Sequence, residues 1–177
     1  MEGLFGTGEP TGNEGTSFLH RRHPEMSKRP QITYQLGWRE WATLPDLGID
    51  RIKCKLDTGA RTSSLHACDM EEFVEGEKRM IAFVVYPQQR RKSEAIHCVG
   101  EMVDERKVKD SGGRSEKRPV IGTTLQVGSW SWPIELTLTN RDQMGFRMLL
   151  GRTALRKRFI VDPGLSFLAD RKWSVSK

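Results

Sequence analysis

The residues best suited to chemistry form a short run, Asp57-Thr58-Gly59, which directly follows an apolar stretch ending at Leu56. An aspartate at the end of a strand places its carboxylate at an edge, where it can face a cleft. Gly59 lets the backbone turn sharply and lets another chain approach without a Cβ in the way. Thr58 adds a hydroxyl that can fix neighbouring backbone. Alone this is a weak signal, because aspartate-containing turns are common at strand ends.

A second run near the C-terminus strengthens the first. Met148-Leu149-Leu150 is an apolar stretch followed by Gly151, Arg152 and residues suited to one helical turn. In this order the two runs resemble retropepsins, in which an apolar-Asp-Thr-Gly-Ala segment is followed by two apolar residues, Gly-Arg and a short helix. In that family the second strand passes beneath the first loop, and the glycine permits the close crossing. The resemblance implies catalytic roles for Asp57, Thr58 and Gly59, and structural support from Gly151 and Arg152.

The chain is similar in particular to the bacterial RimB-like proteins, whose older label is "ATP-dependent zinc protease". The resemblance implies an all-β, retropepsin-like acid-protease barrel with one short C-terminal helix and one lobe per chain. It covers most of residues 36–169, through the stretches 37–40, 44–45, 55–67, 103–108, 118–121 and 132–142.

A retropepsin site needs two aspartates, and this chain has a single Asp-Thr-Gly. Asp162-Pro163-Gly164 lacks the hydroxyl residue and is followed by too short a segment for a second lobe. Two carboxylates about 3 Å apart cannot both ionise comfortably, so they share one proton. The ionised one takes a proton from water, and the protonated one donates to the scissile carbonyl. We therefore expect a homodimer, with Asp57 from each chain at the two-fold axis.

Short alternating runs separated by turn signals predict an all-β domain over residues 31–170. A helix is expected at Ala154–Phe159, and two closing strands at Ile160–Asp162 and Leu165–Leu168. Residues 1–30, rich in small and polar side chains, are predicted to be a disordered tail, and 171–177 a C-terminal tail. The other expected strands are 32–37, 40–44, 49–56, 62–68, 79–86, 95–104, 118–128 and 131–139, with Met148–Leu150 beside the second motif.

By its order along the chain, the hairpin that covers the site in retropepsins falls between Val85 and Arg118. Residues 86–118 hold nine basic and six acidic side chains. A lid of this kind would exclude water other than the nucleophile. Glycines are expected at its tip. The substrate-binding residues expected in the loop and the lid are Ala60, Arg61, Arg106, Gly112, Gly113 and Arg118.

Arg61 departs from the retroviral pattern, in which an acid at this position pairs with the Gly-Arg arginine. Arg61 and Arg152 would repel each other. We expect either that Arg152 finds another carboxylate or that both arginines face an anion. Since arginine binds carboxylates through a two-pronged fork, this departure favours an acidic substrate.

The formal net charge of +6 also favours an acidic partner. Residues 1–30 hold four basic and four acidic side chains, whereas 141–158 hold six basic side chains and one acid. A solvated basic face would explain the charge equally well. RimB-like proteins are associated with RimK-type ligases that append glutamates to a small-subunit ribosomal protein. The resemblance therefore implies an aspartic peptidase for a glutamate-extended tail, with such a ligase as a partner.

Three other classes are less favoured. The cysteines and histidines form no His-Glu-x-x-His or Cys-x-x-Cys pattern, and no Gly-rich phosphate loop with lysine is present, so no metal or cofactor is predicted. Nucleic-acid binding is disfavoured because the basic stretch 141–158 holds a single aromatic residue, Phe146, rather than aromatic residues interleaved with the basic ones. A non-catalytic binding protein of the ribosome-modification system, using the same fold, stays open as an alternative.

Three cysteines and the absence of a secretory signal or an apolar run of about 20 residues predict a cytoplasmic protein with reduced thiols.

Overall fold

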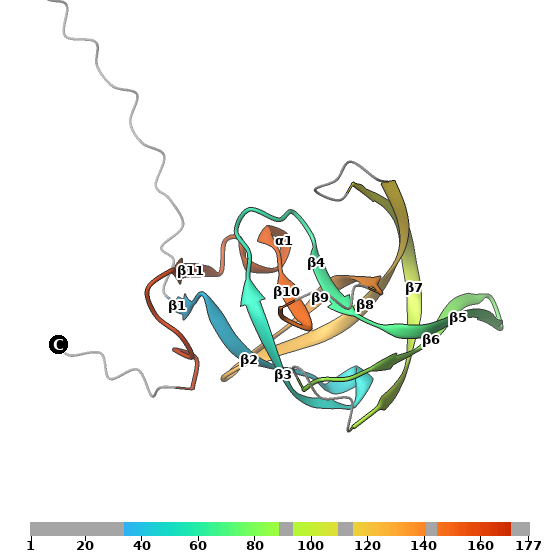
Figure 1. Cartoon of the computed structure of the whole chain (residues 1–177), viewed down its shortest axis with the longest axis horizontal. Coiled ribbons are helices and arrows are strands. Elements are labelled where there is room, and N and C mark those ends of the chain that lie inside the picture. The colour runs from blue at the N-terminus through green and yellow to red at the C-terminus, as the bar shows by residue number, and fades with distance from the viewer. Residues whose placement is uncertain (1–33, 89–93, 110–114, 141–144, 171–177) are drawn as a thin grey trace, which may run out of the picture. The chain divides into compact units, whose positions relative to one another are not determined.

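The computed structural model of the 177-residue chain describes residues 34–88, 94–109, 115–140 and 145–170. These residues form strands with one α-helical turn and one 3-10 turn among them (Figure 1). None of the described helices is long and apolar enough to span a membrane. Both predicted tails, and the expected lid glycines Gly112 and Gly113, lie outside the described residues. The elements are β1 (Tyr34–Gly37), β2 (Arg39–Leu44), η1 (Pro45–Leu47), β3 (Ile49–Leu56), β4 (Ser63–His66), β5 (Cys68–Glu75), β6 (Lys78–Val85), β7 (Ile96–Lys109), β8 (Ser115–Val127), β9 (Trp130–Thr139), β10 (Met148–Leu150), α1 (Arg152–Leu155) and β11 (Phe159–Asp162).

Six of the strands close into a barrel, in the order β2-β3-β10-β4-β9-β8. The pairing of Thr43 with Gln126 joins β2 to β8 and completes the ring. Alternation along β9 shows which face is the core, since Trp132, Ile134, Leu136 and Leu138 are buried. Because alternate residues of a strand point to opposite faces, this pattern fills the barrel with apolar side chains. The predicted all-β barrel is confirmed.

The sheet continues beyond the barrel as β7, β6 and β5 (Figure 1). Strands β7 and β8 are long and pair in register up to Lys109 and Ser115, so a hairpin stands where the lid is expected. Strand β5 was not predicted. Its residues are almost all exposed, with acids on both faces, so the burial pattern that marks a strand is missing. Pairing with β6 forms it instead.

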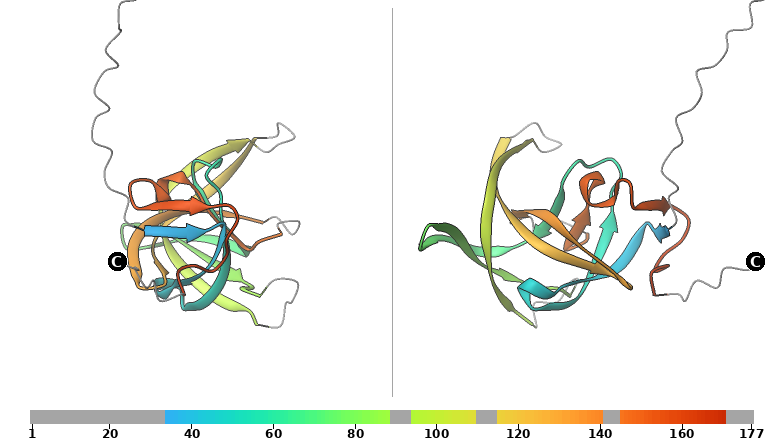
Figure 2. Two further views of the ribbon diagram at one scale, coloured as in Figure 1. Left: turned by 90° about the vertical axis from the view of Figure 1, so that its left-hand side faces the viewer. Right: turned by 180° about the vertical axis from the view of Figure 1, so that it is seen from behind.

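Strands β1 and β11 form a separate parallel pair, visible as two arrows side by side in the left view of Figure 2. The segment after β11 is not the closing strand predicted at Leu165–Leu168. The buried Glu40 carboxylate, rather than strand pairing, holds this segment. Its Oε1 accepts from the N–H groups of Gly37 (2.6 Å) and Leu168 (2.9 Å), and its Oε2 accepts from the N–H of Ala169 (3.3 Å).

The helix was predicted two residues too late and too long. It spans Arg152–Leu155, because Arg156 is extended and Lys157 has a φ of 63°. Helix α1 is held to the barrel by Trp132, whose ring N–H donates to the carbonyl of Ala154 (3.1 Å). A single turn is too short to be stable alone, so this packing determines where it forms.

Candidate active site

Asp57 stands at the end of β3, in the loop that leads to β4. Its Oδ1 accepts from the N–H groups of Gly59 (3.0 Å) and Ala60 (3.1 Å). Its own N–H donates to the carbonyl of Leu150 (2.8 Å), which extends the pairing of β3 with β10 by one residue. A Cβ on Gly59 would lie 3.2 Å from Oδ1. The carboxylate is therefore fixed through one oxygen, and among the described residues Oδ2 has no hydrogen-bond partner.

Strand β10 passes between β3 and β4, parallel to the first and antiparallel to the second. At the crossing, a Cβ on Gly151 would lie 2.5 Å from the carbonyl carbon and oxygen of Thr62. Only glycine fits such a contact with backbone. The next two N–H groups of the chain, those of Arg152 and Thr153, donate to the loop carbonyls of Ala60 (2.9 Å) and Arg61 (3.1 Å). The loop thus rests on the strand beneath it.

The Arg152 side chain completes this support. Its Nη1 donates to the carbonyl oxygens of Thr58 (3.1 Å) and Gly59 (2.8 Å). The carboxylate partner that was one of the two outcomes predicted for Arg152 is not found among the described residues, and the other outcome, an anion that both Arg61 and Arg152 face, stays a prediction. Carbonyl oxygens suffice to hold the guanidinium, so no acid is needed at position 61. No ion pair of Arg61 or Arg152 is found among the described residues.

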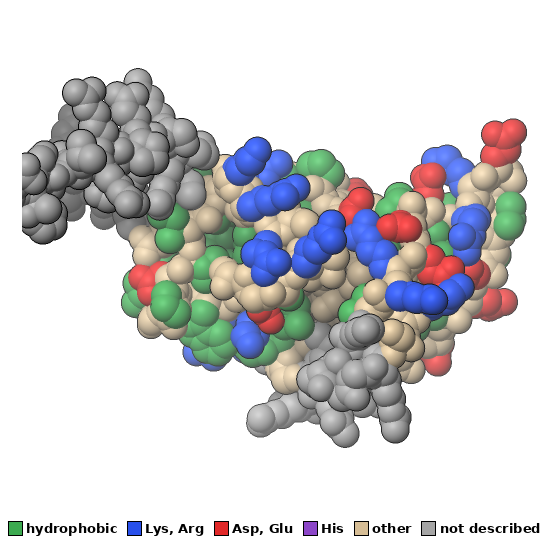
Figure 3. Space-filling view, turned by 90° about the horizontal axis from the view of Figure 1, so that it is seen from above, with side chains coloured by type: hydrophobic (Ala, Val, Ile, Leu, Met, Phe, Trp, Pro, Cys, Tyr) green, Lys and Arg blue, Asp and Glu red, His purple; other side chains and the backbone are tan. Residues whose placement is uncertain are grey.

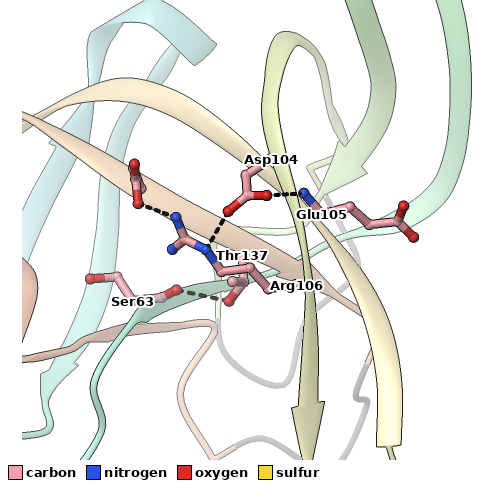
Figure 4. Close-up of polar contacts among 6 residues, drawn as sticks. Ser63, Asp104, Glu105, Arg106 and Thr137 are labelled. Atoms are coloured by element: carbon pink, nitrogen blue, oxygen red, sulfur yellow. Dashed lines mark hydrogen bonds and ion pairs between the residues drawn. The ribbon is translucent and has the colours of Figure 1, made fainter.

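Two hydroxyl residues below the loop were not predicted as part of the site. The buried Ser63 Oγ accepts from the N–H of Gly151 (3.1 Å). The Thr137 hydroxyl donates to the Ser63 carbonyl (2.8 Å), as Figure 4 shows. The run of hydroxyl residues 62–64 was the available signal. Small polar side chains in a buried strand usually satisfy backbone groups.

The residues expected to bind substrate are only partly brought together. Thr58, Gly59 and Arg61 are exposed on the loop, and Ala60 is half-buried. Seen from above, on the side of this loop, Lys and Arg side chains gather across the surface (Figure 3). The side of the molecule on which the loop between β3 and β4 lies therefore carries many basic side chains.

Arg106 lies on β7 and is already engaged by two acids (Figure 4). Its Nε contacts Asp104 Oδ2 (2.7 Å) and its Nη2 contacts Glu135 Oε2 (2.6 Å). The hydrogen bond with Glu135 raises the pKa of Arg106 above its usual range. Arg118 is paired with one acid among the described residues, through its Nε and Glu116 Oε2 (3.0 Å).

The two buried cysteines, Cys54 and Cys98, show no sign of a thiolate site. Burial raises the pKa of Cys54 to about 12 and that of Cys98 to about 11, so both stay neutral thiols at ordinary pH. Among the described residues, no group of three or more His, Cys, Asp or Glu side chains is arranged to hold a metal ion.

Comparisons with known proteins agree with this geometry. Residues 35–172 match the RimB-like family, described as "Retropepsin-like aspartic endopeptidase RimB". A "Probable alpha-L-glutamate ligase" of Shewanella pealeana is 44% identical over 137 residues, which are 77% of this chain and 30% of that protein. One of Parasynechococcus marenigrum is 48% identical over 128 residues, 72% of this chain and 28% of that protein. The chain thus spans less than a third of these relatives' length.

A crystal structure of a Legionella pneumophila protein of unknown function has the same fold. Its TM-score is 0.66 at 33% identity, covering 77% of this chain and 98% of that one. The fold, the Asp57 loop braced by β10 and the match over residues 35–172 lead to one conclusion: the chain belongs to the RimB-like family of retropepsin-like aspartic endopeptidases.

Proposed function

We propose that this chain is one half of a homodimeric aspartic endopeptidase that cleaves an acidic, glutamate-extended protein tail, with a second copy supplying the other Asp57. The observation that carries the proposal is the Asp57 carboxylate itself. One oxygen is fixed by two backbone N–H groups, and the other has no partner among the described residues. A carboxylate so held can activate water when a second one shares its proton.

The mechanism requires two such carboxylates across a two-fold axis. In the pair, one aspartate is ionised and takes a proton from the bridging water, which then attacks the scissile carbonyl carbon. The other is protonated and donates to the carbonyl oxygen. Breakdown of the tetrahedral intermediate returns a proton to the leaving nitrogen. Because the pair titrates as a unit, its two pKa values belong to the dimer rather than to one residue.

The acidic substrate is supported by charge and by the relatives. Lys and Arg side chains gather on the face that presents the Asp57 loop (Figure 3). Relatives named as glutamate ligases carry a matching segment within a longer chain. A hydrolase joined to a ligase that adds glutamate would trim the product of that ligase. The carrier expected from the family resemblance is a small-subunit ribosomal protein, with a RimK-type ligase as partner.

The proposal is tested by mass spectrometry of a glutamate-extended peptide incubated with the full chain. Wild type should shorten the peptide, with or without a chelator, and Asp57→Asn should not. The dimer has its own test: titrating Asp57→Asn into wild type should lower activity more than simple dilution does, because mixed dimers hold one aspartate. Peptide binding with no cleavage by wild type would instead favour the non-catalytic alternative.

A further inference from the structure

Strands β2 and β3 pair with each other and carry basic and aromatic residues on their outward face. Alternate residues of the two strands, such as Leu44 and Ile52, are buried in the core, so the residues between them point out of the barrel. The outward residues are Arg39 and Trp41 of β2 and Arg51, Lys53 and Lys55 of β3. The face therefore combines arginines and lysines with an indole ring.

Five side chains form a continuous stack across this face, the aromatic–basic row. In order they are Arg51, Trp41, Phe167, Arg39 and Trp38. The Arg51 guanidinium carbon lies 4.1 Å from the Trp41 ring centroid, and the Trp41 and Phe167 rings stack with centroids 5.7 Å apart and planes 19° apart. The Arg39 guanidinium carbon then lies 5.3 Å from the Phe167 centroid and 4.8 Å from the Trp38 centroid. Each cation is close enough to a ring face for a cation–π contact.

Phe167 joins the row in a strained backbone conformation. Its φ of 55° lies in the left-handed region, which is unfavourable for a bulky residue. Its N–H donates to the carbonyl of Arg39 (2.9 Å), and the Arg39 Nε donates to the hydroxyl of Ser166 (3.0 Å). Strain of this kind persists where the surrounding structure imposes it, and it gathers at binding sites. The Phe167 ring is therefore held against Trp41 at a cost to the local backbone.

The cations of this face lack acidic partners. Within the described ranges no ion pair is found for Arg39, Arg51, Lys53 or Lys55. The register even places Arg39 directly opposite Lys55, and like charges in that position destabilise a sheet. Arg51 is exposed and the others are half-buried, so solvent reaches them. Positive charges gathered in this way favour an anionic ligand.

The neighbouring surface shows which anion fits. A hollow of about 690 Å³ lies beside the row and is lined in part by Trp41, Arg51 and Lys53. The carboxylates of Asp50 and Glu94 also line it. They would repel the side chains of an acidic peptide, whereas they can accept hydrogen bonds from the amino groups of bases. Rings and guanidinium planes beside cations are the surface on which single-stranded nucleic acids stack their bases.

We propose that the outward face of β2 and β3 binds single-stranded nucleic acid, with phosphates paired to Lys53 and Lys55 and bases stacked at the Trp41 and Arg51 end of the row. Aromatic residues interleaved with basic ones, which the stretch 141–158 lacks, are assembled here by strand pairing. This binding needs neither cleavage nor a second copy, so it is independent of the proposed peptidase.

The test measures the affinity of the full chain for a fluorescent oligothymidylate of about 12 nucleotides at several salt concentrations. Lys53→Gln combined with Lys55→Gln should raise the Kd about tenfold. It should also lower the slope of log Kd against log salt by about 1.4, because each phosphate contact on a single strand contributes about 0.7. Lys78→Gln combined with Lys117→Gln removes the same charge from two exposed ion pairs and should change the Kd by less than about twofold.

A second variant tests the rings. Trp41→Leu should raise the Kd about tenfold and leave the salt slope unchanged, because stacking of a base releases no counterions. Tyr34→Leu, which removes an exposed ring elsewhere, should change the Kd by less than about twofold. Thermal unfolding checks that each variant is folded. If Trp41→Leu does not fold, the two pairs of lysine variants still decide the proposal.

Three results would overturn the proposal. The first is the absence of oligothymidylate binding by the wild type, and the second is an equal Kd for the two pairs of lysine variants, which would assign binding to overall charge. The third is tighter binding of oligoglutamate than of oligothymidylate, with the loss in the Lys53 and Lys55 variant, which would assign the face to acidic peptides. An unchanged Kd in folded Trp41→Leu would contradict stacking on the row.

Discussion

In the Asp-x-Gly turns at Asp57 and Asp162 the glycine N–H donates to the aspartate side chain, and the difference between the two turns shows what makes a carboxylate available for chemistry. In both, the aspartate Oδ1 accepts from the N–H of the glycine two residues on, at 3.0 Å for Asp57 and 2.8 Å for Asp162. The other oxygen of Asp162 accepts a hydrogen bond from the Gln35 side chain (2.8 Å), which joins β11 to β1. Both oxygens of that carboxylate therefore have partners. The other oxygen of Asp57 has no partner among the described residues.

The surroundings of the two turns differ as much as the carboxylates do. The Asp57 loop rests on β10 through Gly151, receives N–H groups from the start of α1, and is bound by the Arg152 side chain. These contacts with β10, α1 and the Arg152 side chain fix the loop without engaging the second oxygen of Asp57. The local turn is thus an ordinary one, and the crossing strand is what sets the Asp57 turn apart.

The largest effect should come from breaking the crossing. Gly151→Ala places a Cβ 2.5 Å from the Thr62 backbone, which cannot move without moving the loop. We expect a loss of about 3 kcal/mol or more in the free energy of unfolding, or failure to fold. Denaturant unfolding measures it. Gly145→Ala is the matched control, since an added Cβ there meets nothing described within 4 Å and should change stability by less than about 1 kcal/mol.

The segment after the second turn depends on Glu40 instead. Glu40→Gln replaces one acceptor oxygen with an N–H group facing backbone N–H groups, which leaves a buried donor unsatisfied. We expect a loss of about 2 kcal/mol in the free energy of unfolding. Glu135→Gln, on an exposed carboxylate, is the comparison. Equal stability of the two variants would show that Glu40 does not hold this segment.

Support of the Asp57 loop by Arg152 can be weakened without unfolding the chain. Arg152→Ala removes two hydrogen bonds to loop carbonyls, so stability should fall by about 1 kcal/mol. Peptide cleavage should fall further, with kcat about tenfold to a hundredfold lower, because the carboxylate is less well positioned. Arg156→Ala, an exposed neighbour, should leave kcat unchanged. A change in KM alone would assign Arg152 to substrate binding.

The smallest effect is expected at the thiols. Because burial raises their pKa, Cys54 and Cys98 are neutral at pH 7 and should resist alkylation in the folded protein. As pH rises above about 9, an unfolded thiol ionises while these two do not, so stability should decline through the range up to about 12. Mass spectrometry after alkylation checks the first point. Rapid labelling of either thiol at neutral pH would contradict their burial.

Much of the scaffold could be predicted from the sequence because its strands alternate. Alternating burial and turn residues mark β2, β3 and β9, and the two motifs mark the crossing of β10 beneath the loop. Strand β5 could not be predicted, because its exposed, acidic residues show no alternation and its pairing with β6 alone makes it a strand.

Parts of the site depended on contacts that sequence does not reveal. Arg61 suggested a missing acid for Arg152, but the carbonyl oxygens of Thr58 and Gly59, one and two residues after Asp57, hold the Arg152 side chain. Arg147 stood in a basic stretch like any other surface arginine. Only its packing in the folded chain shows that this arginine is buried, with 8% of its surface exposed.

The most direct test compares the two turns in one assay. A glutamate-extended peptide is incubated with wild type, Asp57→Asn and Asp162→Asn, and the products are weighed by mass spectrometry from acidic to neutral pH. Wild type and Asp162→Asn should cut at the same positions, and Asp57→Asn should not cut at all. Cleavage by Asp57→Asn at the wild-type rate would contradict an aspartic mechanism at this site.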